Sequence, residues 1–217
     1  MHSEGASDPR ANPPGQMPAT DDEIKEKYLE RAIRELNAFS RELLECPHCP
    51  RGNFTPVQGS GHPQADVFLL KHAPRPAEIE EGVAFYGRSG NAVMKSLARL
   101  GIDPLTVYGT LCVKCPVPDV ALADPACIAR IAEEIAIVRP RIVVAMGEWA
   151  VSALNDAGVP LAQEVEFVPG ARRALTPTIE VLVTPDIDAS LDDDESKRAF
   201  WSAFKALGDW YAELPPY

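Results

Sequence analysis

The sequence predicts a three-layer α/β/α domain built around a central, mostly parallel sheet. Residues 67–70 and 142–147 form short, continuous apolar runs, which are typical of strands buried on both faces of a parallel sheet. Segments with the three-and-four spacing of amphipathic helices separate these runs from two further strand-like runs. Such alternation favours parallel strands with helices covering both faces of the sheet.

The length and composition of the chain fit one such domain. The chain has 217 residues, of which 46% are hydrophobic and 24% are charged, enough for one α/β domain with a full core. Residues 1–19 are rich in Pro, Gly, Ser and Asp and lack apolar periodicity, so we expect a disordered leader. Residues 20–217 are then the single domain.

Charge and cysteine content narrow the class of protein. A net charge of -11 argues against a broad basic surface that coats DNA, although a narrow basic groove stays compatible with it. No stretch approaches the roughly 18 apolar residues of a membrane span, and residues 1–16 lack the features of a signal peptide. We therefore expect a cytoplasmic protein without membrane association, whose five cysteines serve a metal site rather than disulfides.

The first half of the chain contains two helical patterns and a buried strand. Thr20 and Glu23 form a capping-box pattern ahead of a long amphipathic helix that runs into Cys46. The strand at residues 67–70 ends in Lys71-His72, which puts polar side chains at a strand exit, where open α/β sheets bind ligands. A Gly-x-x-Gly turn at residues 87–90 then leads into a helix that ends at Gly101.

The second half of the chain repeats this alternation. A strand at about residues 106–113 precedes a helix that ends before Pro140. A helix follows the strand at residues 142–147 directly, and a further strand at residues 179–183 runs out to Asp186. The last helix, about residues 190–214, begins with an acidic turn that suits its dipole.

The spacing of the cysteines indicates a metal site. Cys46 and Cys49 form a Cys-x-x-Cys pair that can supply two of four ligands, and Cys115 and Cys127 are the candidates for the other two. An alternative joins this pair to Cys112-x-x-Cys115 as a zinc ribbon, which leaves Cys127 unused. In the first arrangement Cys112 is a buried strand residue.

At this point the motifs resemble a known family, the uracil-DNA glycosylase superfamily, and specifically its iron-sulfur branch, often called family four. The resemblance spans about residues 46–205. The matching segments are Cys46-x-x-Cys49, Ala73-Pro74, the residues 85–90, Val107-Tyr108, the residues 113–116, Cys127 in a helix, and the residues 139–147.

The resemblance implies a fold, a cofactor and a function. It implies a four-iron, four-sulfur cluster held by Cys46, Cys49, Cys115 and Cys127, with zinc as the alternative metal. It also implies a monomer that binds DNA through a flipped base and hydrolyses the N-glycosidic bond of a deaminated or modified base in DNA repair. The linker between Cys115 and Cys127 looks shorter than is usual in the family.

Three polar positions of the family motifs differ in this chain. His72 stands where the branch has a Glu that activates water, and Asp186 stands where it has a His that stabilises the departing base. Leu111 stands where it has an Asn that reads the uracil edge. We expect His72 and Asp186 to be the catalytic pair, working as a base and its orienting partner. The alternatives are a hydrogen-bonded strand-end residue for His72 and a turn cap ahead of Ser190 for Asp186.

The remaining base-binding and loop residues are assigned by the same resemblance, and two further residues by their place at a helix start. Phe85 would stack on the flipped base, with a core residue as the alternative, and Leu111 would line the base-binding position. Arg88 and Ser89, at a helix start, are expected to hold a phosphate of the DNA. Arg172 and Arg173 follow Pro169-Gly170 in what we expect to be a DNA-contacting loop, with a solvated loop as the alternative.

Two other functions compete with base excision. One is a catalytically inactive module of the same fold that binds nucleic acid or a nucleotide. The other is a zinc-stabilised α/β domain with an unrelated role.

Overall fold

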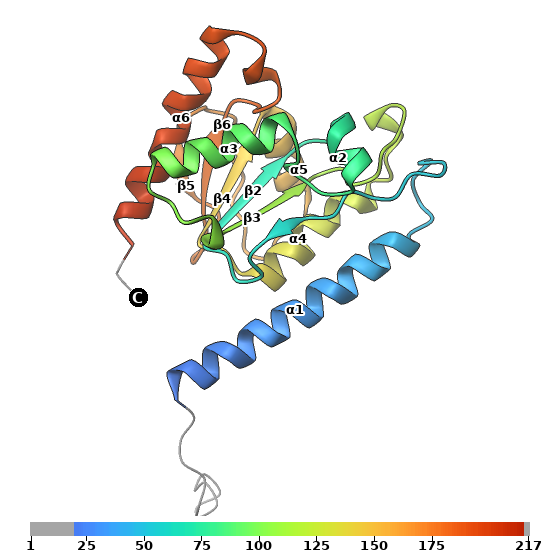
Figure 1. Cartoon of the computed structure of the whole chain (residues 1–217), viewed down its shortest axis with the longest axis horizontal. Helices are drawn as coiled ribbons and strands as arrows, with labels where there is room; N and C mark the ends of the chain where they lie inside the picture. The colour runs from blue at the N-terminus through green and yellow to red at the C-terminus, as the bar shows by residue number, and fades with distance from the viewer. Residues whose placement is uncertain (1–19, 215–217) are drawn as a thin grey trace, which may run out of the picture.

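A computed structural model describes residues 20–214, which form a mixed α/β fold around one sheet (Figure 1). The described strands, in chain order, are β1 (Ser60–Gly61), β2 (Val67–Lys71), β3 (Val107–Leu111), β4 (Ile142–Met146), β5 (Arg172–Ala174) and β6 (Glu180–Thr184). Their order across the sheet is β1-β3-β2-β4-β6-β5. The four inner strands pair in parallel and the two edge strands are antiparallel. The mostly parallel sheet is therefore confirmed, whereas the predicted leader lies outside the described residues.

Helices cover both faces of the sheet, as a three-layer domain requires. They are α1 (Asp21–Glu45), α2 (Pro76–Glu81), α3 (Arg88–Arg99), α4 (Ala126–Val138), α5 (Glu148–Asp156) and α6 (Asp194–Ala212). In β2, Phe68 and Leu70 join a core with α4 and α5, whereas Val67 and Leu69 join a core with α3 and α6. Because side chains alternate along a strand, the continuous apolar run supplies both cores at once.

Helix α1 begins as the sequence predicts, but much of its apolar stripe is not covered. Thr20 and Glu23 form the reciprocal capping box, with the Glu23 amide donating to the Thr20 hydroxyl at 3.3 Å. The helix packs against α4 and buries Ala32, Phe39 and Leu43. The remaining large apolar side chains that stay exposed are Ile24, Tyr28, Ile33 and Leu44.

Local hydrogen bonds change two of the predicted features, one helix start and one loop. The last helix starts at Asp194 rather than near residue 190, since the Asp193 carboxylate accepts the amides of Glu195 and Ser196 as an N-cap. A short 3-10 turn, Ala189–Leu191, precedes it. The expectation of a loop at residues 172–173 is wrong, because these residues pair with β6 as the edge strand β5.

A buried ion pair ties β3 to α4. Lys114, just beyond β3, lies 2.5 Å from the carboxylate of Glu134 in α4, and both side chains are buried. The Tyr108 and Thr110 hydroxyls donate to the same carboxylate, so its oxygens are satisfied. Among residues 20–214, no helix is both long and apolar enough to cross a membrane.

Candidate functional site

The candidate site lies at the carboxyl edge of the central strands. Lys71, Met146 and Thr184 end three neighbouring parallel strands in register with one another. The residues that follow them, including His72 and Asp186, therefore come to the same edge of the sheet. Ligands bind at this edge in open α/β folds because the loops that diverge there leave a crevice.

His72 lies in an electrostatic setting that favours its neutral form. Its ring stacks on the indole of Trp149, with centroids 5.5 Å apart and planes 15° from parallel. Partial burial lowers the pKa of His72, and the nearby Asp186 carboxylate opposes this shift. A neutral imidazole beside a carboxylate has the properties of a general base whose protonated form can be stabilised.

Asp186 lies against Gly147, the residue that follows β4. A Cβ on Gly147 would lie 3.0 Å from the Cβ of Asp186, and the Gly147 φ of 93° also favours glycine. One Asp186 oxygen accepts the Ala189 amide at 2.8 Å, so Asp186 caps the following turn, which was the structural alternative for this residue. Asp186 thus caps this turn, and its charge also raises the pKa of His72.

Phe85 is held in an unusual backbone conformation beside a cavity. Its φ of 59° is in the left-handed region, and its amide donates to the buried Glu78 carboxylate at 2.6 Å. Its ring covers Gly109 of β3, where a Cβ would lie 2.5 Å from the ring. The ring borders a cavity of about 250 Å³ between α3 and the sheet.

Leu111 gives this region an apolar wall. It is fully buried at the end of β3 and belongs to a small apolar cluster with Val57, Ala84 and Phe85. Its side chain has no polar atom with which to bond the edge of a base.

The predicted DNA-contacting residues lie on two elements, and two of the arginines have acidic partners. At the start of α3, exposed Arg88 pairs with Asp192 at 2.9 Å and Ser89 is buried. On β5, Arg172 lies 3.2 Å from both Glu180 and Glu213. Arg173 is exposed on the same strand. Ion pairing reduces the positive potential that Arg88 and Arg172 present to a phosphate.

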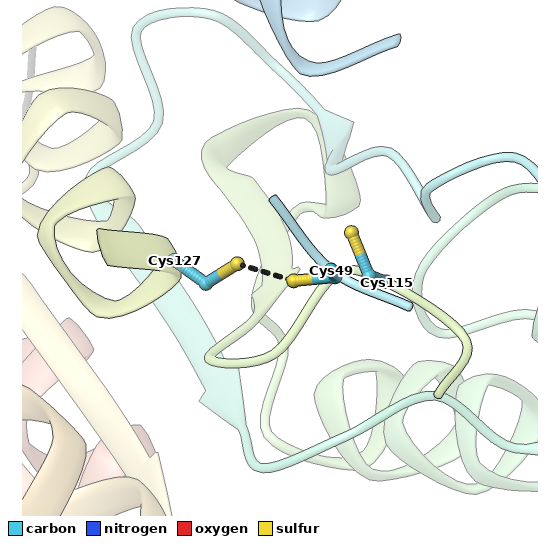
Figure 2. Close-up of side chains that lie close together, drawn as sticks. All are labelled: Cys49, Cys115 and Cys127. Atoms are coloured by element: carbon cyan, nitrogen blue, oxygen red, sulfur yellow. Dashed lines mark hydrogen bonds between the residues drawn. The ribbon is translucent and has the colours of Figure 1, made fainter. Parts of the chain in front are cut away.

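Three thiols gather into a buried cluster, the candidate metal centre (Figure 2). The sulfurs of Cys49, Cys115 and Cys127 lie within 4.8 Å of one another, and all three residues are buried. They come from the loop after α1, the segment after β3, and the first turn of α4. Cys46, at the C-cap of α1, is half-buried and does not belong to this group.

The thiols influence one another strongly, as the ligands of one centre do. The pKa of Cys115 falls to about 6, chiefly through its hydrogen bond with Cys127, with contributions from Cys49 and Arg51. The pKa of Cys127 rises because Cys115 and burial both favour its protonated form. The thiolate is the form that ligates metals, and the lowered pKa of Cys115 favours this form.

Cys112 is not part of the thiol cluster. It is fully buried in the apolar core with Phe68 and Ile131, and burial raises its pKa to about 12. All five cysteines lie within the described residues and none of them forms a disulfide. The zinc-ribbon arrangement needs Cys112 as a ligand and leaves Cys127 unused. The observed group contains Cys127 and not Cys112, so it does not match that arrangement.

A larger cavity than the one beside Phe85 lies elsewhere. Its volume is about 580 Å³, and its walls include Arg141 and Ile179, which precede β4 and β6. It therefore opens near the amino ends of these strands, whereas His72 and Asp186 follow the carboxyl ends. We assign the site by the convergence of polar groups rather than by cavity size.

Comparison with known proteins identifies the family. A family model described as the uracil DNA glycosylase superfamily matches residues 58–207. The chain belongs to the uracil DNA glycosylase superfamily. The match includes His72, Phe85, Leu111 and Asp186, and it begins after Cys46 and Cys49.

Relatives named type-4 uracil-DNA glycosylase confirm the resemblance to family four of this superfamily. The protein from Pyrobaculum aerophilum is 28% identical over 142 residues, which cover 63% of this chain and 72% of that protein. The protein from Sulfurisphaera tokodaii is 30% identical over 121 residues, covering 52% and 54%. The one from Archaeoglobus fulgidus is 26% identical over 126 residues, covering 54% and 62%. The chain thus matches little more than half of the second relative's length.

Sequence reasoning missed several residues at this superfamily site. Lys71 was noted only as a polar residue at a strand exit and Asp188 only as a further possible turn cap, and the fully buried Glu78 was not singled out. Trp149 lies in the helix predicted to follow residues 142–147 but was not proposed as a site residue, and 69% of it is exposed. An exposed Trp beside a strand exit is a signal for a contact surface.

Proposed function

We propose that this superfamily member hydrolyses the N-glycosidic bond of a deaminated or modified base in DNA. The observation that carries the proposal is the convergence of His72 and Asp186 at the carboxyl edge of the sheet, where the pKa of His72 responds to the Asp186 charge. The names of the type-4 relatives support DNA as the substrate.

His72 would act on the attacking water. As the water oxygen bonds to C1′ of the sugar, the C1′–N bond breaks and its electron pair leaves with the base. The water proton passes to the neutral His72 ring, and Asp186 stabilises the imidazolium that forms. The imidazolium then gives up this proton, by way of water, to the base anion, so that the neutral base is released and His72 is again neutral. The depressed pKa of His72 keeps the imidazole free to accept a proton near neutral pH.

Phe85 would receive the base once it has been flipped out of the stack. An extruded base needs an aromatic face in place of its former neighbours, and Phe85 offers an aromatic ring that is only partly buried. Leu111 supplies apolar contact and no hydrogen bond to the base edge. We therefore expect weaker discrimination between uracil and other bases than a polar side chain would give.

For the thiol cluster we propose a four-iron, four-sulfur cluster bound by Cys46, Cys49, Cys115 and Cys127. Three buried thiols from separate segments fit the donor set of such a cluster, and Cys46 lies three residues from Cys49 as a fourth. The cluster would tie the segment after α1 to β3 and α4 and take no part in the hydrolysis. Iron and sulfide analysis of protein purified without oxygen tests this, because a zinc protein would be colourless and contain no iron.

Base release from oligonucleotides carrying uracil, hypoxanthine or xanthine tests the enzymatic function. We expect release from at least one substrate, and a loss of about 100-fold or more in His72→Gln and Asp186→Asn. His62→Gln is the matched control, since its ring only accepts the Gln64 amide in the described chain. Release that survives unchanged in both site variants would contradict the assignment of the pair.

The second candidate is a catalytically silent module that binds nucleic acid. The apolar Leu111 favours it, because this position cannot hydrogen-bond a base. Such a module would bind DNA with a salt-dependent constant, release no base, and lose affinity on replacement of Arg172 and Arg173 by alanine.

A further inference from the structure

A network of buried charges joins three segments of the candidate site. Lys71 ends β2 with its side chain fully buried. Its ammonium donates to Glu78 of α2 and to Asp188 of the turn after β6, at 2.7 Å each. Glu78 is fully buried and the Asp188 side chain is 12% exposed.

Glu78 carries this network to Phe85. One of its oxygens accepts the Lys71 ammonium and the Arg75 amide, and the other accepts the Phe85 amide. The hydrogen bond from the Phe85 amide holds Phe85 at a φ of 59°, which is unfavourable for a bulky side chain. The Lys71 ammonium also lies 5.7 Å from the centre of the Phe85 ring.

Asp188 carries the network to the other side of the site. It lies two residues after Asp186, and the same oxygen that accepts Lys71 is 3.3 Å from the Arg75 guanidinium. Lys71 itself directly precedes His72. The Lys71 ammonium therefore connects its own segment, which carries His72, to the segment that carries Asp186. Through Glu78, it is also connected to Phe85.

Stability alone does not account for the network. Desolvating two carboxylates and an ammonium costs several kcal/mol per ion, and apolar residues of similar volume often stabilise a fold as well or better. Such a network does, however, fix geometry, because each charge requires its partners at hydrogen-bond distance.

We propose that Lys71 and Asp188 are positioning residues that lock the segment carrying Asp186 against the segment carrying His72, with Glu78 extending the lock to Phe85. Neither residue touches the reacting atoms in this assignment. The consequence for turnover rests on the proposed function, whereas the lock itself does not.

Hydrogen exchange tests the lock without any need for activity. Asp188→Ala removes one arm and leaves the Lys71–Glu78 pair in place, so the fold is expected to survive. We expect amide exchange to speed up about ten- to a hundredfold in residues 72–75 and 186–191, as the loss of a buried charged hydrogen bond predicts. Asp194→Ala is the matched control, because it breaks only an exposed pair with Lys197. Unchanged exchange in both segments, or equal acceleration along the whole chain, would overturn the proposal.

Turnover provides the second readout. In the full chain, we expect Asp188→Ala to lower kcat for base release by about 100-fold with little change in KM, as misplacement of reacting groups does. Asp188→Asn keeps an acceptor for Lys71 and should recover part of the rate. An unchanged kcat despite faster local exchange would overturn the positioning role. If the unmodified chain releases no base, the proposed function fails, and the exchange result alone decides whether the lock exists.

Discussion

His72 is the residue on which the proposed chemistry depends, and Trp149 controls its surroundings. The indole covers one face of the imidazole and contributes to the burial that lowers its pKa. Because the folded chain binds a proton here less readily than the unfolded chain, folding stability falls as the pH drops from about 6.5 through the folded pKa.

Removing the indole of Trp149 should bring the pKa of His72 back toward its ordinary value. In Trp149→Ala we expect the pKa of His72 to rise, because water then reaches the ring while Asp186 still attracts its charged form. The loss of stability between pH 6.5 and the folded pKa should shrink accordingly. NMR titration of the imidazole resonances measures this, with His62 as the internal control. A His72 pKa that falls or stays constant would show that the indole is not the source of the desolvation.

Leu111 offers a gain-of-function test at a single position. Leu111→Asn places an amide in an apolar cluster, so we expect a loss of about 1–3 kcal/mol in the free energy of unfolding. If this position contacts the base, the amide should increase the preference for uracil over other bases. Chemical unfolding and competitive base-release assays measure the two effects. Leu111→Ala, which loses packing without gaining an amide, should show no such preference.

At the next scale, the elements are held together by a few buried charges. The Lys114–Glu134 pair links the end of β3 to α4, and these two elements also lead to Cys115 and Cys127. The relative placement of the two thiols therefore depends on how β3 and α4 pack.

Neutralising one partner of this pair should destabilise the domain. Glu134→Gln leaves the Lys114 ammonium buried without its counter-charge, and we expect a loss of about 3–5 kcal/mol. Glu133→Gln on the same helix is the control, since it breaks only a partly exposed pair with Arg130 and should cost less than about 1 kcal/mol. Thermal and denaturant unfolding measure both. Equal costs for the two variants would mean that the buried pair does not join the elements.

For the molecule as a whole, the thiol cluster joins segments that are far apart in the sequence. Cys49 and Cys127 are 78 residues apart, yet their sulfurs lie 3.2 Å from each other. A metal bound here would cross-link the segment after α1, β3 and α4, and would stabilise the fold by the free energy of its binding.

Two cysteine variants separate metal binding from core packing. On the proposed iron-sulfur assignment, we expect Cys127→Ala to lose its iron and to unfold at a lower temperature. Cys112→Ala should keep its iron with a smaller stability change, because Cys112 only packs in the apolar core. Iron and zinc analysis together with thermal unfolding measures both effects. Zinc that is lost in Cys112→Ala and retained in Cys127→Ala would instead support the zinc-ribbon ligand choice.

The sequence by itself determined the fold class, the order of its main elements and the family. These follow from local signals: the two-faced apolar runs at β2 and β4, the capping box at Thr20, and motif spacings along the chain. It also indicated His72 and Asp186 as site residues, because polar residues at the ends of parallel strands meet at one edge.

The tertiary structure alone decided which distant side chains meet. Lys71 and Asp188 are 117 residues apart and bond to each other, and Arg172 is paired with two carboxylates. The grouping of Cys127 with Cys49 and Cys115 agrees with the ligand set that the resemblance implied. The periodicity of the sequence does not encode these contacts, because each depends on how several elements pack. A charge that this packing buries then needs an oppositely charged partner beside it.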